Sequence, residues 1–404
     1  MNLLEERRGP LLTVDLAAVA ANTELFRART GAALMAVVKA DGFGHGSTDV
    51  ARTALAHGAS RLGVTSIAEG LRLRSAGLTA PVLSWLNPVH ADVEAALVAD
   101  LELAVPGARH LARIVAAATV TGRRARVHLH ADVGMARDGA EPAAWAELCA
   151  EAKRAEQRGL LDVVGVMGHL GCAADPDDPH NAEGRRIFRD AVTTTRRYGL
   201  RPRHRHLAAT AATLTDPASH FDLCRIGAGL IGVDPSATTR LRPALTLTAP
   251  VVSVRDVPAG TAVGYGHAHV TARPTRLALI PVGYADGIPR SAAPGARVQL
   301  RDRRHPVAGQ VSMDQTVIDV GEENVEPGEI VTVFGPGDDG EPTAAEWARW
   351  SGTIEHEIVT GIGARVDRRA VPATSATSAT YSTHGTYDTY SEHGVQRQTL
   401  AVSA

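Results

Sequence analysis

Lysine is the rarest charged residue in this sequence, and one of its two lysines lies where an amine could do chemistry. Of the 42 basic residues, only Lys39 and Lys153 are lysine. Lys39 ends an apolar run and starts the glycine-rich turn Lys-Ala-Asp-Gly-Phe-Gly-His-Gly, after which Ser47 is expected to cap a helix. A primary amine can lose its proton and bind a carbonyl cofactor as an imine, which a guanidinium cannot do. The alternative is a lysine that reaches solvent from a strand end, but the depletion of lysine favours the chemical interpretation.

Glycine-rich segments supply further candidate site residues. Arg225 opens the loop Arg-Ile-Gly-Ala-Gly-Leu-Ile-Gly, whose bare backbone N–H groups suit a phosphate, although the same pattern also makes a plain turn. Tyr265 lies between two glycines and is either a functional phenol or a partly buried aromatic in a bend. Tyr284 and Met313 occupy polar turns after apolar runs, which are either parts of a site or ordinary hairpin connections.

Three more basic side chains, Arg137, His169 and His206, are expected at or beyond the ends of buried strands. Each of them alone is more often a structural residue than a catalyst. The histidines do not predict a metal site, because the sequence contains no HExxH motif and no paired CxxC. The acidic stretch at 175–180 is interpreted as a solvated loop, and three cysteines are too few for a disulfide framework.

The alternation of apolar runs with amphipathic segments predicts a parallel (β/α)8 barrel of the TIM type over residues 11–242. An open doubly wound sheet is the alternative, but eight strands and no GxGxxG turn after the first favour the barrel. The expected strands are 34–39, 61–65, 81–85, 101–104, 125–130, 163–169, 204–208 and 223–226. The expected helices include 48–56, 67–75, 108–118, 143–156 and 184–198. In such a barrel Lys39 lies at the carboxyl-terminal mouth, where barrel enzymes bind their ligands.

The pattern changes near Pro243, where short strands and turn residues predict an all-β domain over residues 243–369. Its expected strands are 249–254, 276–280, 297–300, 307–311, 316–320 and 330–334. A capping box from Thr343 to Glu346 announces one late helix. An N-terminal segment, 1–10, precedes a strand at 11–14 that could pair with either domain. The tail at 370–404 is rich in Ser, Thr, Ala and Tyr and is expected to be disordered.

Length and composition restrict the class of protein. With 404 residues, of which 44% are hydrophobic and 21% charged, the chain can bury the cores of two domains. The net charge of −2 gives no basic surplus for binding nucleic acid or an anionic membrane. No apolar run approaches the ~18 residues of a membrane span, and the start has no apolar signal region. We therefore expect a cytoplasmic protein that binds neither nucleic acid nor membrane.

Taken together and in this order, the motifs resemble those of the alanine racemases, a family of pyridoxal-phosphate enzymes of fold type III. They are AVVKADGFGHG, a Val-Gly-Met-x-Arg loop, RIGAGL, GYGH, PVGYADG and VSMDQ, and the resemblance extends from about Leu11 to Arg369. No single motif is convincing alone, but the combination is highly specific. It implies a barrel followed by a β domain, pyridoxal 5′-phosphate as cofactor and a small amino acid as substrate. It also implies a homodimer with shared active sites.

The resemblance implies roles for individual residues. Lys39 would hold the cofactor and act as the base on one face of the substrate, while Tyr265 of the partner subunit would act on the other face. Racemisation requires a proton to leave one face of a carbon and another to arrive on the opposite face. Lysine amines and tyrosine phenols ordinarily have pKa values near 10, so the site must lower them by burial or positive neighbours. Arg225 would lie at the pyridine nitrogen with His206 supporting it, and His169 would lie near Tyr265. The positions implied around the cofactor and its phosphate are Phe43, Thr210, Gly227, Ala228 and His356. Arg137 and Met313 would lie at the substrate carboxylate, and Tyr284 would lie at the entrance.

The choice of arginine at position 225 has a chemical consequence. A guanidinium stays protonated, so Arg225 can only donate a hydrogen bond to the ring nitrogen, which is left without a proton of its own. The cofactor then becomes a weaker electron sink, which should limit side reactions such as transamination.

Four positions depart from the usual pattern of the family. Phe43 replaces a tyrosine in the lysine turn, and His356 replaces a tyrosine that touches phosphate and narrows the inner gate. His130 matches a lysine that is often carbamylated, and Ala209 matches a common asparagine. The sequence thus predicts a racemase that interconverts L- and D-alanine. The alternatives are a racemase or epimerase for another amino acid in specialised metabolism, or a cofactor-binding protein of weak activity.

Overall fold

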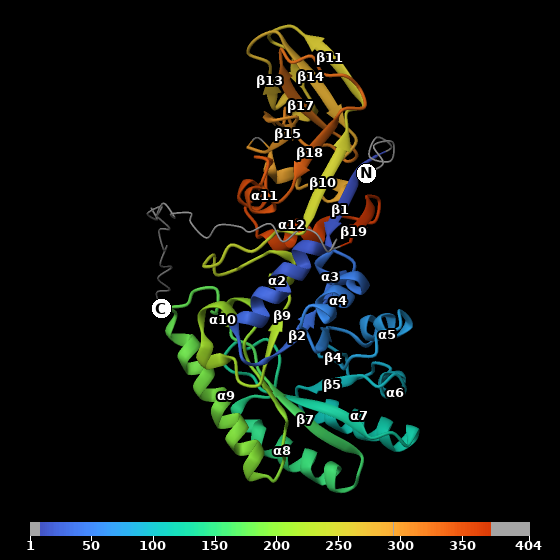
Figure 1. The fold of residues 1–404 in the computed structure, drawn as a ribbon, viewed down its shortest axis with the longest axis vertical. Helices are drawn as coiled ribbons and strands as arrows, with labels where there is room; N and C mark the ends of the chain where they lie inside the picture. Colours follow the sequence, from blue (N-terminus) through green and yellow to red (C-terminus); the bar gives the residue numbers. More distant parts are fainter. Residues whose placement is uncertain (1–8, 294, 373–404) are drawn as a thin grey trace, which may run out of the picture. The chain divides into compact units, whose positions relative to one another are not determined.

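The computed structural model describes residues 9–293 and 295–372, and its first part is the predicted barrel (Figure 1). The strands of this part are β2 (Ala33–Val37), β3 (Arg61–Val64), β4 (Val82–Ser84), β5 (Glu102–Val105), β6 (Ala125–His130), β7 (Leu161–Met167), β8 (His204–His206) and β9 (Leu223–Ile226). All are parallel and follow the order β8-β7-β6-β5-β4-β3-β2-β9. Hydrogen bonds from Asp222 N to Arg205 O at 3.1 Å and from Arg225 N to Ala208 O at 3.0 Å join the two ends. The sheet is therefore closed.

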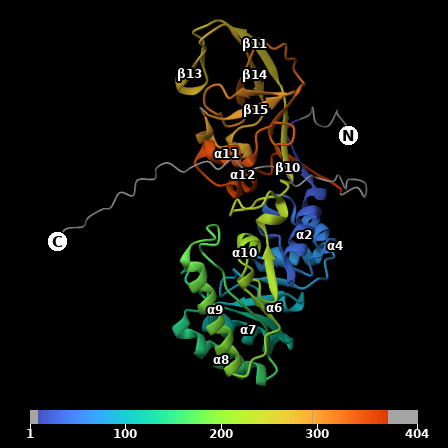
Figure 2. The ribbon, with the colours of Figure 1, turned by 60° about the vertical axis from the view of Figure 1, so that its left-hand side comes forward.

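Helices alternate with these strands, and Figures 1 and 2 show α7, α8 and α9 on the outside of the barrel. The helices are α2 (Leu16–Arg29), α3 (Lys39–Phe43), α4 (Ser47–Ala56), α5 (Ile67–Ser75), α6 (Val93–Val98), α7 (Ala108–Thr121), α8 (Pro142–Gln157), α9 (Pro179–Arg197) and α10 (Thr210–Thr215). Helix α7 buries Leu111, Ile114 and Ala118, the spacing of one helical face. Helices α2 and α6 were not among the predicted ones. Alanines lie all around α2, so it has no distinct apolar face, and α6 has only six residues.

The second part is a β domain, drawn from yellow to red in Figure 1 except for its blue strand β1. Its strands are β1 (Leu11–Asp15), β10 (Leu245–Pro250), β11 (Ser253–Val257), β12 (Ala262–Val263), β13 (His269–Val270), β14 (Thr275–Ile280), β15 (Arg297–Leu300), β16 (Arg303–Pro306), β17 (Thr316–Gly321), β18 (Ile330–Phe334) and β19 (Asp367–Val371). One sheet has the order β16-β15-β18-β10-β1-β19 and a second has the order β11-β14-β17. Because β1 pairs with β10 and β19, the first strand of the chain belongs to this domain.

The predicted capping box is confirmed at the start of α11 (Ala344–Ser351), which is followed by α12 (Glu355–Gly361). Glu346 N donates to Thr343 Oγ1 at 3.2 Å, and Thr343 N donates to Glu346 Oε2 at 2.9 Å. Helix α12 matters for function because it carries His356.

Two strand predictions in the β domain were wrong. The expected strand 249–254 is two strands, β10 and β11, which separate after Pro250. The expected strand 307–311 does not form, because β16 pairs with β15 in its place and Val307 makes only an isolated bridge to Ile318. Gly309, with a φ of 79°, interrupts the extended backbone of that run.

A continuous hydrophobic core extends through the barrel and the larger sheet of the β domain. It includes Phe26 and Met35 in the first part and Phe334 and Trp347 in the second. Among the described residues, no helix is long and apolar enough to cross a membrane. The predicted disordered tail lies outside the described residues, apart from its first three positions. Two of these, Ala370 and Val371, belong to β19, so the prediction was wrong there.

Candidate active site

The turn that follows Lys39 has an unusual backbone conformation. Ala40 and Asp41, within α3, have φ values of 50° and 52°, in the left-handed region. Such a conformation costs roughly 1–2 kcal/mol for each residue other than glycine. Glu69 stabilises the turn, because its Oε1 accepts the backbone N–H of Ala40 at 2.8 Å. Surrounding hydrogen bonds hold the backbone in this strained conformation, and the backbone next to Lys39 is therefore fixed in position.

The prediction that Ser47 caps the next helix was wrong. It is the first helical residue of α4, and Gly46 occupies the capping position. The N–H of Ser47 donates to Asp41 Oδ1 at 2.9 Å. The carboxylate of Asp41 therefore ties the lysine turn to the helix.

The amine of Lys39 is partly buried among positive charge. Burial lowers the pKa of Lys39, the charge of Arg137 lowers it further, and Glu69 opposes both effects. Its Nζ lies 5.8 Å from the centroid of the Phe43 ring. A lowered pKa increases the fraction of neutral amine, which is the form that attacks a carbonyl.

Arg225, on β9, is 4% exposed and is held by the loops after β7 and β8. Its Nη1 lies 3.1 Å from His206 Nδ1, and its Nη2 lies 3.1 Å from His169 Nδ1 and donates to Gly168 O at 2.8 Å. Burial lowers the pKa of Arg225 to about 10, which leaves it charged at neutral pH. Among the described residues Nε has no hydrogen-bond partner, so this fixed cation keeps one N–H for a ligand.

His169 shows that the cationic groups converge. Burial lowers the pKa of His169 to about 3, and the charges of Arg225, Arg137 and Lys39 add to that effect. The imidazole is therefore neutral and can accept from Arg225. The charges of three candidate cations from separate segments thus act on one neutral histidine.

The loop after β9 meets the start of α10. Thr210, which is buried, uses its Oγ1 to accept the N–H of Gly229 at 3.1 Å. The segment η2 (Ala228–Ile231) is a short 3-10 turn that follows Gly227. The structure therefore brings together Thr210, Gly227 and Ala228, the three predicted phosphate residues.

Phe43 fills the space beside this loop. A Cβ atom on Gly227 would lie only 2.8 Å from Cζ of the Phe43 ring. The ring also lies 6.2 Å from the His356 ring, centroid to centroid. Burial and the charge of Lys39 lower the pKa of His356. The two residues that replace tyrosines of the family pattern are therefore in contact with each other, at the phosphate end of the candidate site.

The other two departures also lie near this group. His130 is 6% exposed, with its Nδ1 3.5 Å from Asp138 Oδ2. The neighbouring Arg137 is exposed and, among the described residues, makes no hydrogen bond or ion pair. Ala209 precedes α10 and provides no side-chain cap.

Tyr265, Tyr284 and Met313 form a second group, on the surface of the β domain. They are 69%, 41% and 52% exposed. Tyr284 N donates to Ser312 O at 3.0 Å, which joins the turns of Tyr284 and Met313. Within the described part of the chain, no hydrogen bond, ion pair or ring contact links this group to Lys39. One chain therefore contains two separate sets of predicted site residues.

Arg365 forms ion pairs that stabilise the turns of this second group. Its Nη1 donates to Asp314 Oδ1 at 2.7 Å, and its Nε lies 3.2 Å from Oδ1 of the buried Asp286. The backbones of the two turns are thus fixed while the Tyr284 and Met313 side chains stay open to solvent.

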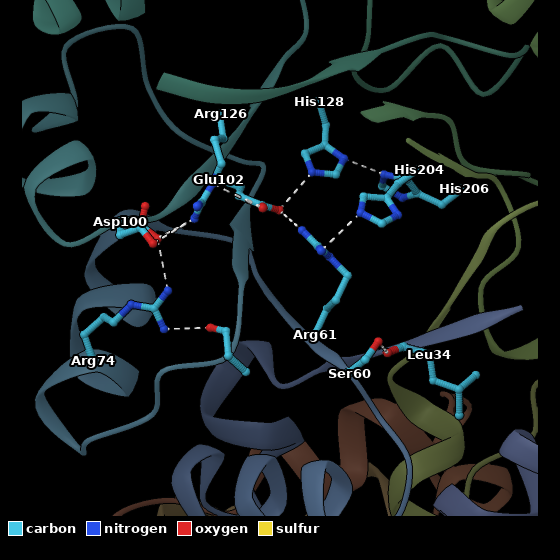
Figure 3. Close-up of polar contacts among 11 residues, drawn as sticks. Leu34, Ser60, Arg61, Arg74, Asp100, Glu102, Arg126, His128, His204 and His206 are labelled. Atoms are coloured by element: carbon cyan, nitrogen blue, oxygen red, sulfur yellow. Dashed lines mark hydrogen bonds and ion pairs between the residues drawn. The ribbon is translucent and has the colours of Figure 1, made fainter. Parts of the chain in front are cut away.

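The sequence analysis missed three ionisable residues in the barrel interior, which Figure 3 shows: Arg61, Glu102 and His128. His128 lies between His206 at 2.8 Å and Glu102 at 3.0 Å, and Arg61 is bonded to the same carboxylate. A signal was available, because all three lie within runs predicted as buried strands, where an ionisable residue needs a reason.

Two family models match most of the described chain. The model of the alanine racemase N-terminal domain matches residues 14–235, and that of the C-terminal domain matches residues 244–370. The first range contains Lys39 and Arg225, and the second contains Tyr265 and His356.

Similar proteins carry the same family name. The alanine racemase of Frankia casuarinae is 48% identical over 365 residues, which cover 89% of this chain and 95% of that protein. The alanine racemase of Thermobifida fusca is 45% identical over 359 residues, 88% of this chain and 96% of that protein. The crystal structure of alanine racemase from D-cycloserine producing Streptomyces lavendulae has a TM-score of 0.88 at 41% identity, covering 90% of this chain and 97% of that one.

Proposed function

We propose, from the premise that this chain belongs to the alanine racemase family, that it interconverts L- and D-alanine with pyridoxal 5′-phosphate as cofactor. One observation carries the proposal: a lysine with a lowered pKa and a buried arginine with one unpaired N–H both act on the same neutral histidine, the lysine through its charge and the arginine through a hydrogen bond. These residues are Lys39, Arg225 and His169. An amine can bind an aldehyde, and a guanidinium can donate a hydrogen bond to a pyridine nitrogen.

The residues of this site fit the cofactor at two of its three ends. Lys39 supplies the amine that holds the aldehyde, and Arg225 supplies the Nε–H for the ring nitrogen. At the phosphate end, Phe43 lies beside Gly227 but has no hydrogen-bond donor in its side chain. The groups that hold the phosphate are the hydroxyl of Thr210, the backbone of Gly227 and Ala228, and the imidazole of His356.

When bound, pyridoxal 5′-phosphate supplies an electron sink that makes the α-hydrogen of an amino acid easier to remove. Lys39 Nζ exchanges a proton on one face of the α-carbon, and the phenol of Tyr265 of the partner subunit does so on the opposite face. Arg225 donates to the ring nitrogen and, because it keeps its own proton, leaves that nitrogen unprotonated. Arg137 binds the substrate carboxylate.

The active form is a homodimer with two shared sites. Tyr265 is 69% exposed and lies apart from Lys39 within one chain, as do Tyr284 and Met313. A two-fold interface presents the same surface of each subunit to the other, so it completes two equivalent sites. Tyr265 of the partner subunit then lies near His169, while Tyr284 and Met313 line the entrance and the carboxylate region.

A chiral product assay tests the reaction. Purified protein with added pyridoxal 5′-phosphate is given each common L-amino acid, and the D-enantiomer is measured. We expect D-alanine to form fastest. If no D-amino acid forms from any substrate in cofactor-loaded protein, the chain is not a racemase.

Reductive labelling tests the cofactor assignment. Borohydride reduction of the loaded protein should leave a pyridoxyl group on Lys39 and none on Lys153, whose Nζ donates to Glu156 at 2.7 Å. Lys153 is a natural control, because it is the only other lysine of the chain. A label on Lys153, or none in loaded protein, contradicts the role of Lys39.

A second candidate function is a racemase or epimerase for another amino acid. It is favoured by the pair Phe43 and His356, because an imidazole is shorter than a phenol and leaves more room for a side chain. Faster turnover of a larger amino acid in the chiral assay would support it. A cytoplasmic location stays a prediction, to be checked by cell fractionation.

A further inference from the structure

A line of polar side chains extends from Arg225 through the barrel interior. Figure 3 shows its other three members, His206, His128 and Glu102. His206 Nε2 lies 2.8 Å from His128 Nδ1, and His128 Nε2 lies 3.0 Å from Glu102 Oε2. These three side chains come from β8, β6 and β5 and are 0%, 0% and 3% exposed. Polar groups at such depth destabilise a fold unless each finds a partner. Here every neighbouring pair along the line lies within hydrogen-bond distance.

The donors and acceptors of this line follow one direction. Arg225 Nη1 always carries hydrogen, so Nδ1 of His206 accepts at 3.1 Å and its proton lies on Nε2. That Nε2 donates to Nδ1 of His128, which in turn donates from Nε2 to Glu102. Burial lowers the pKa of both histidines and keeps them neutral. The line therefore leads from a cation to a carboxylate, with each imidazole in one tautomer.

Glu102 is the fixed end of the line. Burial alone would raise the pKa of Glu102, but hydrogen bonds from His128 and Arg61 and the charge of Arg61 hold it well below its usual range. On the other side of the carboxylate, Arg126 Nε lies 3.5 Å from Oε1 and its Nη2 lies 2.9 Å from Asp100. Glu102 is thus an ionised acceptor at neutral pH.

The neighbouring strand leaves space for this arrangement. Gly165 lies on β7, between the strands of His128 and His206. A Cβ atom at this position would lie 2.0 Å from His128 Nδ1, far inside van der Waals contact. Only glycine admits the imidazole in the orientation that reaches both of its partners.

We propose that Glu102 is a positioning residue that acts through His128 and His206 to keep Arg225 aimed at its ligand. The proposal rests on the proposed function, in which that ligand is the ring nitrogen of pyridoxal 5′-phosphate. An ionised Glu102 forces both imidazoles to turn their lone pairs toward Arg225. Without it the tautomers can reverse, and His206 then presents an N–H to a guanidinium that has only N–H groups to offer.

Four variants separate positioning from stability. Glu102→Gln removes the charge that fixes the direction, because an amide at the end of the line can either accept from His128 or donate to it. His128→Leu interrupts the line, whereas His128→Gln preserves its direction, because between His206 and an ionised Glu102 the amide accepts through oxygen and donates through nitrogen. The matched control is Glu341→Gln. Glu341 is also a buried carboxylate, 5% exposed, but it accepts backbone N–H groups of Gly337 and Asp339 in the β domain.

The loaded enzyme gives the first readout. A poorly held Arg225 allows the ring nitrogen to gain a proton, which favours transamination: the amino group of alanine passes to the cofactor, giving pyruvate and pyridoxamine 5′-phosphate. We expect the ratio of pyruvate to D-alanine formed to rise about tenfold in Glu102→Gln and His128→Leu, as for weakening one charge-assisted hydrogen bond. His128→Gln and Glu341→Gln should keep the wild-type ratio. An unchanged ratio in the folded Glu102→Gln and His128→Leu variants overturns the proposal.

Nitrogen-15 spectra of histidine in the protein without cofactor give a second, independent readout. The signals of His206 are assigned by their loss in His206→Asn. We expect Nδ1 of His206 to be unprotonated in the wild type and in His128→Gln, and partly protonated in Glu102→Gln. A protonated Nδ1 in the wild type overturns the proposal. Failure of the proposed function would appear instead as absent racemisation and leave these spectra unchanged.

Discussion

The barrel and β-domain groups of candidate residues differ in how completely one chain defines them. Arg225, in the barrel, is 4% exposed, and its two Nη atoms have five hydrogen-bond partners. Tyr265, in the β domain, is 69% exposed, and within the described residues its hydroxyl has no hydrogen-bond partner. A buried group held by several hydrogen bonds has one orientation before any ligand arrives, whereas an exposed side chain samples several. The barrel half is thus built by folding, and we infer that the other half is completed by a second subunit.

The backbones of the two groups differ in the same way. Arg225 belongs to a strand that pairs with β2 and is joined to β8 on its other side. Tyr265 belongs to a short turn between Gly264 and Gly266, whose φ values are 70° and 67°. Interactions across the barrel restrict the first residue, while only local geometry restricts the second.

The largest expected effect comes from separating the two groups into different chains. Homodimers of Lys39→Ala and of Tyr265→Phe should each lose nearly all activity, because every site lacks one proton carrier. In a mixed dimer, one site carries both defects and the other carries none. Half of the dimers are mixed after random exchange, so about a quarter of the wild-type activity should return.

Native mass spectrometry must confirm that subunits have exchanged in this experiment. Mixing Lys39→Ala with Arg225→Leu is the control, because both changes lie in the barrel group and leave no site intact unless the two residues come from different chains. If mixed Lys39→Ala and Tyr265→Phe dimers form without activity, the two groups do not share a site.

A stability experiment sharpens the comparison. Gly165→Ala places a methyl group against His128 and should lower the free energy of unfolding by about 1–3 kcal/mol, as overpacking of a core does. Tyr265→Phe should change it by less than about 0.5 kcal/mol, because the residue is exposed. Denaturant unfolding measures both. Gly31→Ala, where a Cβ would meet nothing within 4 Å, is the control for glycine replacement as such.

The same contrast explains what the sequence could predict. All eight barrel strands overlap predicted strands, and most of them coincide with apolar runs, because strands buried on both faces are nearly continuous in hydrophobic residues. Strand β8, with the sequence His-Arg-His, is the exception in composition. Strand β16, with the sequence Arg-Arg-His-Pro, was missed because it lies at a sheet edge and its pairing depends on β15 rather than on its own pattern. The apolar run at 307–311 was wrongly predicted as a strand, because the pattern of a segment does not specify which segment pairs with β15.

Within the site, positions could be predicted but partners could not. The motifs selected Lys39 and Arg225 because their residue types are chemically distinctive. Nothing in the sequence specified the left-handed φ of Ala40, since that depends on Glu69, 29 residues away. Glu102 and His128 were read as parts of strands, because their meeting depends on which side chains enter a closed barrel.

A smaller effect is expected at the phosphate end of the barrel group, where Phe43 supplies no hydrogen-bond donor. Phe43 directs Cζ toward Gly227, so the hydroxyl of Phe43→Tyr would lie beside the predicted phosphate loop. Hydrogen bonds to charged groups contribute roughly 1.5–3 kcal/mol, so the Kd for pyridoxal 5′-phosphate should fall by about tenfold or more. Fluorescence titration measures it, with Phe43→Leu as the control that adds no donor. Equal or weaker affinity in Phe43→Tyr would show that the hydroxyl meets no phosphate.

The smallest effect is expected at His356, which lies on a helix of the C-terminal region but contacts the barrel group through Phe43. Restoring the longer phenol in His356→Tyr should narrow the gate and shift relative kcat/KM toward alanine and away from larger amino acids, by about tenfold or less. Because burial and Lys39 lower the pKa of His356 from its ordinary 6.5, the imidazole is neutral at and above neutral pH. The wild-type preference series should therefore stay constant as pH rises from 7 and change only on acidification, when the ring gains a proton. Glu357→Gln, an exposed change on the same helix, is the control. An unchanged series in His356→Tyr would place the residue outside the substrate pocket and restrict the barrel group to cofactor binding.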